Sequence, residues 1–379
     1  MQLLSLITKN FRNLVGARMV PCPRFNVLHG DNAQGKTNTL EAIYLMATLR
    51  SFRARRLTEL IRHDASMAEV SAEVHRRGLS QRYDVVVNQG SKQTFVDGKA
   101  TPSLGQYFAG LNVVLFAPED LHIVRGAPAL RRRLLDRAVF NSDPTYLGHA
   151  QTFLRVLRTR NALLRRKLAP PNELLAVYDE QFVREANRVK KARQGYLTAF
   201  EPIIRDTFSQ VTAGSRLTIA YRTNSGNAED LAEALANSRP RDLERHSTTV
   251  GPHLDDFDLL VDGTPARTFA SQGQIRALVL AWKVAEVRFL LQYSGESPLL
   301  LLDDVCSELD ASRTQWLFSF LRSLECQCFV TATDPKMVPH LEHRLDFQVV
   351  AGNARPVEAT KTALPEALSV LNNCNSPDD

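Results

Sequence analysis

Residues 30–37, with the sequence GDNAQGKT, have the types and spacing of a loop that binds nucleotide phosphates. In the pattern G-x-x-x-x-G-K-[ST], glycines let backbone N–H groups turn toward phosphates at the positive end of a helix. We expect Lys36 to reach the β- and γ-phosphates and the Thr37 hydroxyl to bind Mg²⁺. The alternative is a glycine-rich turn without a ligand. The cofactor-binding residues predicted in this phosphate loop are Gly30, Asp31, Asn32, Ala33, Gln34, Gly35, Lys36 and Thr37.

A pair of aspartates could supply the acidic partner that the metal of such a loop requires. Asp303 and Asp304 follow the apolar run Leu299 to Leu302, which is typical of a buried strand. We expect Asp303 to join Thr37 in holding Mg²⁺. Asp304 is then placed to orient or deprotonate the attacking water, so it is predicted as a catalytic residue together with Lys36.

A third motif, SQGQ, begins at Ser271 and precedes a helical pattern. A serine and a glycine at the start of a helix can bind a phosphate from outside, which makes Ser271, Gly273 and Gln274 candidates for cofactor binding. The same residues can equally serve as an ordinary helix cap. The motif alone does not separate these two interpretations.

The elements that must position these residues are also visible in the sequence. RFNVLHG, which precedes the phosphate loop, is typical of a short strand, and the apolar residues of 36–49 recur at helical spacing. This strand–loop–helix order is the setting that the phosphate pattern requires. After Ser271, the predicted helix places Leu278, Ala281, Trp282 and Ala285 on one apolar face.

The composition of the whole chain is that of a globular protein with a full-sized core. Of 379 residues, 44% are hydrophobic and 23% charged, and no apolar run approaches the roughly 20 residues that span a bilayer. The first residues indicate an amphipathic strand and not a signal peptide, so we expect a cytoplasmic protein. Five cysteines without framework spacing predict free thiols and no zinc site.

Positive charge is concentrated between Gln151 and Gly195, where eleven Lys/Arg face four Asp/Glu, a net of +7. Apolar residues at helical spacing predict two helices between Tyr146 and Phe200, interrupted at 169–172 by APPN, which together form a short antiparallel hairpin. Sequence-independent contact with the DNA backbone is one reading of this charge, and solvated helix faces are the other. The predicted DNA-binding residues are Arg155, Arg158, Arg165, Arg166, Lys167, Lys190 and Lys191.

The order of these motifs resembles the ATP-binding cassette (ABC) class. In that class SxGQ is the signature sequence, which completes the γ-phosphate site of the opposite subunit. SELD, residues 307–310, is similar to the loop that crosses the dimer. Thr333 stands where cassette transporters usually have a switch histidine, so the residue that senses the γ-phosphate stays open.

Several stretches narrow the resemblance to the RecF family, in the RecF/SMC-like branch of that class. Lys36 and Ser271 lie 235 residues apart, which matches the large insertion of this branch. The similar stretches are NFRNL at Asn10, SFR at Ser51, FAPEDLHIVRGAPALRRRLLD at Phe116, TTVGPHLDD at Thr248, SQGQIRAL and DDVCSELD. The chain departs from the family pattern at Leu14, Leu134, Leu254 and Ile275. Because Leu254 replaces a charged residue, no phosphate or DNA contact is predicted there.

The resemblance implies an α/β fold, in which an ABC-type P-loop ATPase head carries an inserted, mainly helical lobe with a short helical hairpin. The expected division is 1–115 for the first part of head lobe I and 116–245 for the helical lobe II. Residues 246–365 would form the C-terminal part of the head, and 366–379 a polar tail.

The function that the resemblance implies is that of an ATP-dependent DNA-binding protein of recombinational repair and replication. An ATP-bound homodimer would clamp duplex DNA or single/double-strand junctions, and a weak, DNA-stimulated, Mg²⁺-dependent ATPase would release them. RecR would be a partner, with RecO and RecA as functional ones, and no membrane would be involved. A transporter ATPase subunit, a non-hydrolysing scaffold and a nuclease on such a head are the alternatives; no additional carboxylate cluster supports the last.

Overall fold

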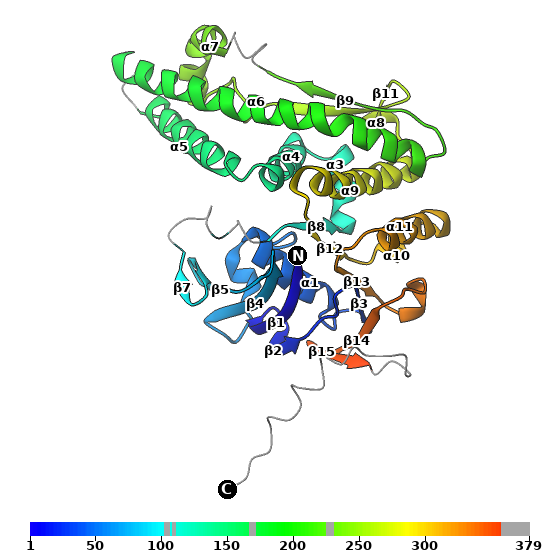
Figure 1. Ribbon diagram of the computed structural model, residues 1–379. Helices are drawn as coiled ribbons and strands as arrows, with labels where there is room; N and C mark the ends of the chain where they lie inside the picture. Colours follow the sequence, from blue (N-terminus) through cyan, green and yellow to red (C-terminus); the bar gives the residue numbers. More distant parts are fainter. Residues whose placement is uncertain (102–106, 108–110, 167–171, 225–230, 358–379) are drawn as a thin grey trace.

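The computed structural model describes residues 1–101, 107, 111–166, 172–224 and 231–357. Two lobes are visible in Figure 1, a head built on two sheets and a helical lobe above it. The N-terminal and C-terminal parts of the described chain both lie in the head, and the middle of the chain forms the helical lobe.

A mainly parallel sheet forms the centre of the head, in the order β15-β14-β3-β13-β12-β8. β3, β13, β12 and β8 are parallel neighbours, β14 is parallel to β3, and β15 is antiparallel at the edge. Almost every residue of the inner strands is buried, because helices and a second sheet cover both faces. The strands are β3 (Phe25–His29), β8 (Val113–Phe116), β12 (Leu299–Leu302), β13 (Cys328–Ala332), β14 (Arg344–Val350) and β15 (Asn353–Val357).

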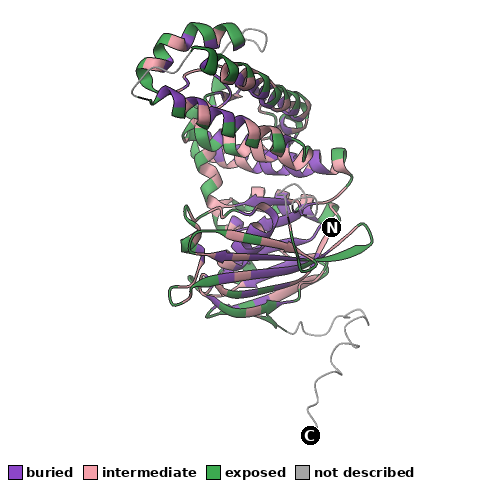
Figure 2. Cartoon of the chain, turned by 90° about the vertical axis from the view of Figure 1, so that its left-hand side faces the viewer, coloured by how far each residue is buried: buried purple, intermediate pink, exposed green. Residues whose placement is uncertain are grey.

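An antiparallel sheet, in the order β2-β1-β4-β5-β6-β7, covers one side of this centre. Helix α1 (Lys36–Thr48) lies between the two sheets, and its apolar residues share one core with both (Figure 2). The strands are β1 (Gln2–Phe11), β2 (Leu14–Met19), β4 (Met67–Arg76), β5 (Leu79–Asn88), β6 (Lys92–Val96) and β7 (Lys99–Ala100).

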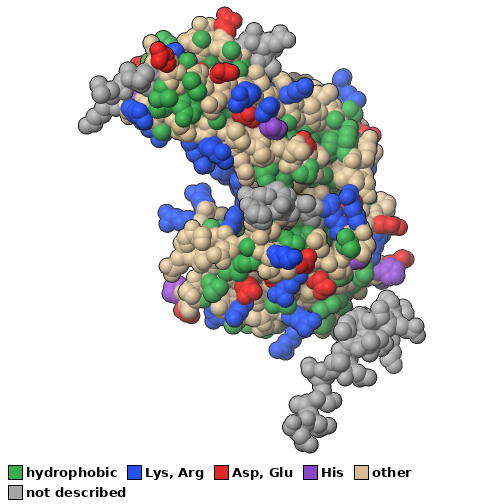
Figure 3. Space-filling view, turned by 60° about the vertical axis from the view of Figure 1, so that its left-hand side comes forward, with side chains coloured by type: hydrophobic (Ala, Val, Ile, Leu, Met, Phe, Trp, Pro, Cys, Tyr) green, Lys and Arg blue, Asp and Glu red, His purple; other side chains and the backbone are tan. Residues whose placement is uncertain are grey.

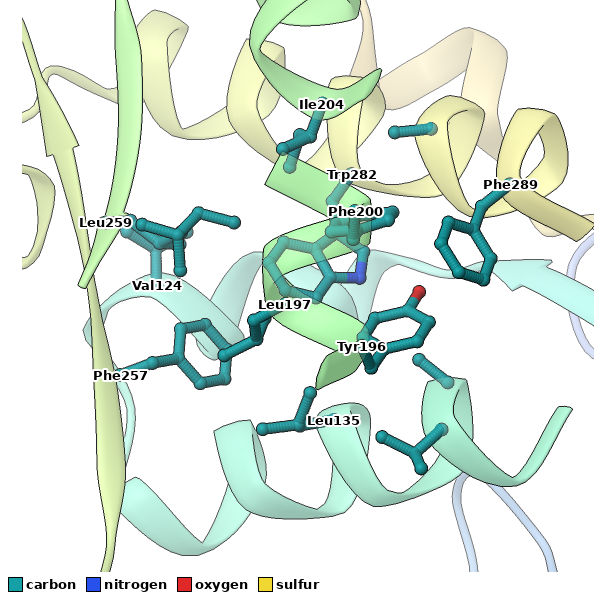
Figure 4. Packing of buried hydrophobic residues seen from close by; sticks show 14 of the residues in the cluster. Val124, Leu135, Tyr196, Leu197, Phe200, Ile204, Phe257, Leu259, Trp282 and Phe289 are labelled. Atoms are coloured by element: carbon teal, nitrogen blue, oxygen red, sulfur yellow. The ribbon is translucent and has the colours of Figure 1, made fainter. Parts of the chain in front are cut away.

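The helical lobe has its own apolar core, which is rich in aromatic residues. Figure 4 shows Trp282 between Phe200 and Phe257, with centroid distances of 4.9 and 5.4 Å. The elements of this lobe are α3 (His122–Arg125), α4 (Pro128–Ser142), α5 (Tyr146–Leu164), α6 (Asn172–Val211), β9 (Leu217–Arg222), α7 (Leu231–Arg245), β10 (Asp256–Val261), β11 (Thr264–Pro265), α8 (Ala266–Phe269) and α9 (Gln272–Ser294).

Helix α9 connects the two lobes. Leu278 and Trp282 belong to the core of the helical lobe, while Leu280, Val284 and Val287 pack against the parallel sheet. Together with α11 (Ala311–Ser323), α9 therefore covers the face of that sheet opposite α1. This position explains why α9 is apolar around most of its circumference.

The predicted boundary at 245/246 does not coincide with the change of lobe. β10, α8 and much of α9 pack in the helical core, and the chain returns to the parallel sheet only at β12. The expected tail, 366–379, lies outside the described residues.

The predicted hairpin corresponds to α5 and α6, which pack against each other as neighbours (Figure 1). Helix α6 is longer than expected, because it continues past Phe200 and through Pro202 to Val211. Ile204 and Phe208 extend its buried face along the helical core, and this packing outweighs the hydrogen bond that Pro202 removes. In the part of the chain that the structure describes, no helix is long and apolar enough to cross a membrane.

Candidate nucleotide site

The phosphate loop joins β3 to α1, as the sequence predicts. Gly30 has φ +143° and Gly35 has φ +118°, both in the region that favours glycine. A Cβ on Gly30 would stand 2.6 Å from the carbonyl oxygen of Val349. Gly35 is the N-cap of α1, so the loop ends where the N–H groups of that helix are unpaired and point outward.

The ammonium group of Lys36 lies across the loop. Its Nζ donates to the carbonyl oxygens of Gly30 at 2.5 Å and Asp31 at 2.8 Å. Burial lowers the pKa of Lys36, and the nearby carboxylates of Asp304, Asp303 and Asp31 oppose that shift. A cation held above the loop in this way is placed to meet phosphate oxygens.

Asp303 and Thr37 come together, although 266 positions separate them in the chain. The Thr37 hydroxyl donates to Asp303 Oδ1 at 2.8 Å, and the Thr331 hydroxyl donates to the same oxygen at 2.8 Å. Burial raises the pKa of Asp303, and the hydrogen bonds from Thr331 and Thr37 oppose this shift. The two residues predicted to hold Mg²⁺ are therefore hydrogen-bonded to each other, and their ligand role stays a prediction.

Asp304 stands at the turn after β12, with a left-handed backbone of φ 49°. Its backbone N–H donates to the Thr331 hydroxyl at 2.9 Å, and its Oδ1 accepts from Ser307 at 2.7 Å. Thr331 thus donates to one aspartate and accepts from the next, which fixes them relative to each other. Sequence reasoning missed Thr331, because only the β12–β13 pairing brings it to this position.

The SQGQ motif is a capping box at the start of α9. Ser271 Oγ accepts from the Gln274 N–H at 3.2 Å, and Gln274 Oε1 accepts from the Ser271 N–H at 2.9 Å. The preceding carbonyl, Ala270, accepts from Arg125 at 2.6 Å. A Cβ on Gly273 would meet nothing closer than the Arg313 guanidinium at 3.8 Å, so the backbone there is open on one side.

A pocket of about 560 Å³ adjoins the phosphate loop. Asn13 connects the two, because its side chain donates to the Ala33 carbonyl at 3.1 Å and accepts from Asn38 at 2.8 Å. Sequence reasoning did not identify this pocket; the arginine-rich run after α1 was the available signal. Its lining residues are Arg12, Asn13, Asn38, Arg53, Ile61, Arg62, His63 and Asp64.

Five of the seven residues predicted to contact DNA lie on the surface. Arg155, Arg158, Arg165, Arg166 and Lys191 are exposed, and Figure 3 shows Lys and Arg side chains around the hollow between the lobes.

The prediction for Lys190 is wrong, because this side chain is fully buried on the inner face of α6. Lys167 lies outside the described residues. Two other cations of the segment, Arg160 and Arg193, are also buried, and both pair with aspartates.

Comparison with known proteins identifies the family to which the chain is similar. The RecF/RecN/SMC N terminal domain family matches residues 2–353. The DNA replication and repair protein RecF of an Anaeromyxobacter species is 43% identical over 349 residues, which cover 89% of this chain and 94% of that protein. RecF of Geobacter sulfurreducens is 37% identical over 368 residues, covering 94% and 100%.

Solved structures give the same answer for the fold. The recombination mediator protein RecF with ATP, of the RecFOR pathway, superposes with a TM-score of 0.87 at 31% identity, covering 94% of this chain and 99% of that one. An Smc head bound to the C-winged helix domain of ScpA has a TM-score of 0.56 at 16% identity. The expected ABC-type ATPase head is confirmed. The chain belongs to the RecF family of DNA replication and repair proteins.

Proposed function

We propose that the protein is a Mg²⁺-dependent ATPase with ATP bound at the phosphate loop. The hydrogen bond between Thr37 and Asp303 carries this proposal, because it brings together a hydroxyl and a carboxylate that would hold Mg²⁺, which would in turn neutralise phosphate charge. Lys36 would exchange its two carbonyl partners for phosphate oxygens. Asp304, next to the metal ligand, would orient or deprotonate the attacking water.

We further propose that two subunits complete the site between them. Ser271, Gly273 and Gln274 begin a helix of the helical lobe, whereas the phosphate loop begins a helix of the head. The open backbone at Gly273 could accept the γ-phosphate of a partner's ATP. Each dimer would then hold two ATP molecules, each bound by one loop and the other subunit's SQGQ.

DNA is the proposed partner of the ATP-bound dimer. The exposed arginines of α5 would contact the phosphate backbone without reading its sequence. Hydrolysis would open the dimer and release gapped or junction DNA. A solved relative is described as a recombination mediator of the RecFOR pathway, which supports RecR and RecO as functional partners. RecA would be a further functional partner, as the resemblance implies.

A DNA-titrated ATPase assay tests this function. We expect weak hydrolysis that requires Mg²⁺ and rises when duplex or gapped DNA is added, with Lys36→Ala as the inactive control. Hydrolysis that ignores DNA would favour a transporter subunit. ATP binding without any hydrolysis, with or without DNA, would favour a scaffold.

A further inference from the structure

Two cysteines lie side by side at the beginning of β13, and the proposed nucleotide site does not use them. Cys326 precedes the strand and Cys328 is its first residue. Both are free thiols, and their Sγ atoms are 3.6 Å apart. Because side chains two residues apart in an extended chain point to the same side, the spacing CQC brings the two sulfurs together.

The two thiols differ in acidity. The hydrogen bond from Cys328 lowers the pKa of the Cys326 thiol; burial opposes this shift, and the Arg24 guanidinium adds to it. Arg24 is fixed beside this segment, because it donates to the carbonyl oxygens of Leu324 and Arg322. Burial raises the pKa of the Cys328 thiol. The pair therefore combines a more acidic thiol, which reacts as its thiolate, with a second thiol that can resolve its oxidised form.

Burial restricts which oxidant can reach the pair. The exposed fraction is 3% for Cys326 and 0% for Cys328, but the neighbouring residue Glu325 is exposed. Cys326 is thus one residue away from solvent, beneath a segment that belongs to no helix or strand. We therefore expect hydrogen peroxide, which is small, to oxidise the folded protein much faster than a bulky disulfide reagent does.

A bond between Cys326 and Cys328 would bend the chain between them. In an extended chain, Cα atoms two residues apart are separated by roughly 6.4–6.8 Å, whereas a disulfide prefers about 5.5–6 Å. The sulfurs would also have to approach from 3.6 Å to about 2 Å. The bend would fall on Gln327, the residue between the two cysteines.

Gln327 joins several strands through buried hydrogen bonds. Its side chain accepts from the Leu3 N–H at 2.7 Å and donates to the carbonyl oxygens of Leu3 and Cys22, at 3.0 and 2.8 Å. Its own carbonyl oxygen accepts from the Leu300 N–H at 3.0 Å. A bend at Gln327 would therefore disturb its contacts with β1, with β12 and with the segment that precedes β3.

These parallel strands carry the residues of the nucleotide site at their other ends. β3 leads into the phosphate loop and β12 leads into Asp303. β13 contains Thr331, which donates to Asp303 at 2.8 Å. Cys328 is the residue at which β13 begins to pair with both β3 and β12. A change in the chain just before Cys328 would thus alter how β13 meets both neighbours.

We propose that Cys326 and Cys328 form a reversible oxidation site, at which peroxide converts the two thiols into a disulfide that destabilises the head and weakens nucleotide binding. The Cys326 thiolate attacks one peroxide oxygen, the O–O bond breaks, and a sulfenic acid and hydroxide result. The Cys328 thiol then attacks the sulfenic sulfur and displaces its oxygen as water. Two thiols and one peroxide thus yield one disulfide and two waters, and a dithiol reductant reverses the oxidation by thiol–disulfide exchange.

Peptide mapping of the wild-type protein tests the oxidation site. The reduced full-length chain is treated with a small excess of hydrogen peroxide, alkylated in denaturant and digested with trypsin, which leaves both cysteines in the peptide 323–336. We expect this peptide to lose two hydrogen atoms and to resist alkylation until dithiothreitol is added. Cys22 and Cys306 should still be alkylated. Alkylation of both Cys326 and Cys328, or a disulfide that includes Cys22, would overturn the proposal.

Cys326→Ser and Cys22→Ser form a matched pair of variants, because each removes one thiol but only the first removes a member of the site. In the wild type and in Cys22→Ser, peroxide should lower Tm by roughly 4 °C or more, since Gln327 loses buried hydrogen bonds. ATP affinity in calorimetry should fall several-fold, and dithiothreitol should restore both quantities. Cys326→Ser should show neither change on treatment with peroxide.

The remaining outcomes separate the steps of this proposal. If the disulfide forms but Tm and ATP affinity do not change, the effect on the strands is overturned. If peroxide weakens ATP binding of Cys326→Ser as much as that of the wild type, the damage lies elsewhere and the proposed effect of the disulfide is overturned. The effect on nucleotide binding rests on the ATPase function proposed above. Failure of the reduced wild type to bind ATP would refute that function, whereas the peptide map still decides the oxidation site.

Discussion

The phosphate loop and the SQGQ motif both place a glycine-containing turn at the start of a helix. They differ in capping, because α9 has a side-chain cap and α1 has none. In the phosphate loop, Lys36 donates to two carbonyl oxygens of its own loop, and the helix begins at a glycine without a side-chain cap. At α9, Ser271 and Gln274 satisfy each other in a closed capping box.

This difference teaches what a motif does and does not specify. The phosphate loop has two glycines with positive φ and a lysine held across it, which are the features that the proposed ATP site requires. The SQGQ motif is a complete helix cap as it stands. The role in nucleotide binding that we propose for it would require the open side of Gly273 and a second subunit.

The largest expected effect comes from Lys36→Ala in the phosphate loop. The lost ammonium group has no substitute nearby, so ATP affinity should fall on the order of a hundredfold or more. Isothermal calorimetry measures it, and circular dichroism controls for folding. ATP affinity equal to that of the wild type would mean that the loop before α1 is not the phosphate site.

Ser271→Arg should have the next largest effect, on assembly and not on ATP binding. It places a bulky cation where the partner's γ-phosphate would lie, while the variant's own loop is intact. Sedimentation with and without ATP should show monomers in both conditions. If Ser271 only caps α9, the variant should lose about 1 kcal/mol of stability and still form ATP-dependent dimers.

A mixture of Ser271→Arg with Lys36→Ala sharpens this result. In a mixed dimer one composite site carries both changes and the other carries neither. We therefore expect at most half-active dimers, visible as partial ATP-dependent association. Full recovery of wild-type assembly would contradict two equivalent composite sites.

The two aspartates should separate metal binding from hydrolysis. Asp304→Asn should keep ATP and Mg²⁺ but slow hydrolysis by roughly a hundredfold or more, so closed dimers accumulate. Asp303→Asn should instead weaken Mg²⁺ binding and ATP-dependent dimerisation, because Asp303 is the carboxylate hydrogen-bonded to Thr37. A normal turnover rate for Asp304→Asn would place the general base elsewhere.

The smallest effect is expected from Gly273→Ala. A Cβ there meets no atom closer than 3.8 Å, so the fold should tolerate it and α9 should gain up to about 1 kcal/mol. Assembly should nevertheless weaken a few-fold, since the methyl group would stand where a phosphate must approach the backbone. A more stable protein with undiminished ATP-dependent dimerisation would show that the open side of Gly273 is not used.

The parts of the site that are continuous in sequence could be predicted well. Strand Leu299–Leu302 has the predicted bounds, because an apolar run followed by aspartates has few alternative structures. The contact between Asp303 and Thr37 is not local, and it was expected only because a phosphate loop requires an acidic partner. Thr331 could not be predicted, since its role depends on strand pairing. The hydrogen bonds of Thr331 with Asp303 and Asp304 join segments that are distant in the sequence, so no local pattern indicates them.

The basic segment shows the corresponding limit for charge. Arg160 and Lys190 counted toward the positive surplus, but both lie on inner helix faces, where Arg160 pairs with Asp242 and Asp179. A count of charges does not distinguish an exposed cation from one that holds helices together.

The order of strands in the parallel sheet has a consequence for how the chain folds. β3 is synthesised early, but its neighbour β13 lies about 300 residues later, and β12 joins β8 only after the entire helical lobe. Contacts between such distant segments form slowly, because a long loop must close first. During translation the apolar strands β3 and β8 are therefore made well before these partners, and unpaired apolar strands of this kind are prone to aggregation until the last strands emerge.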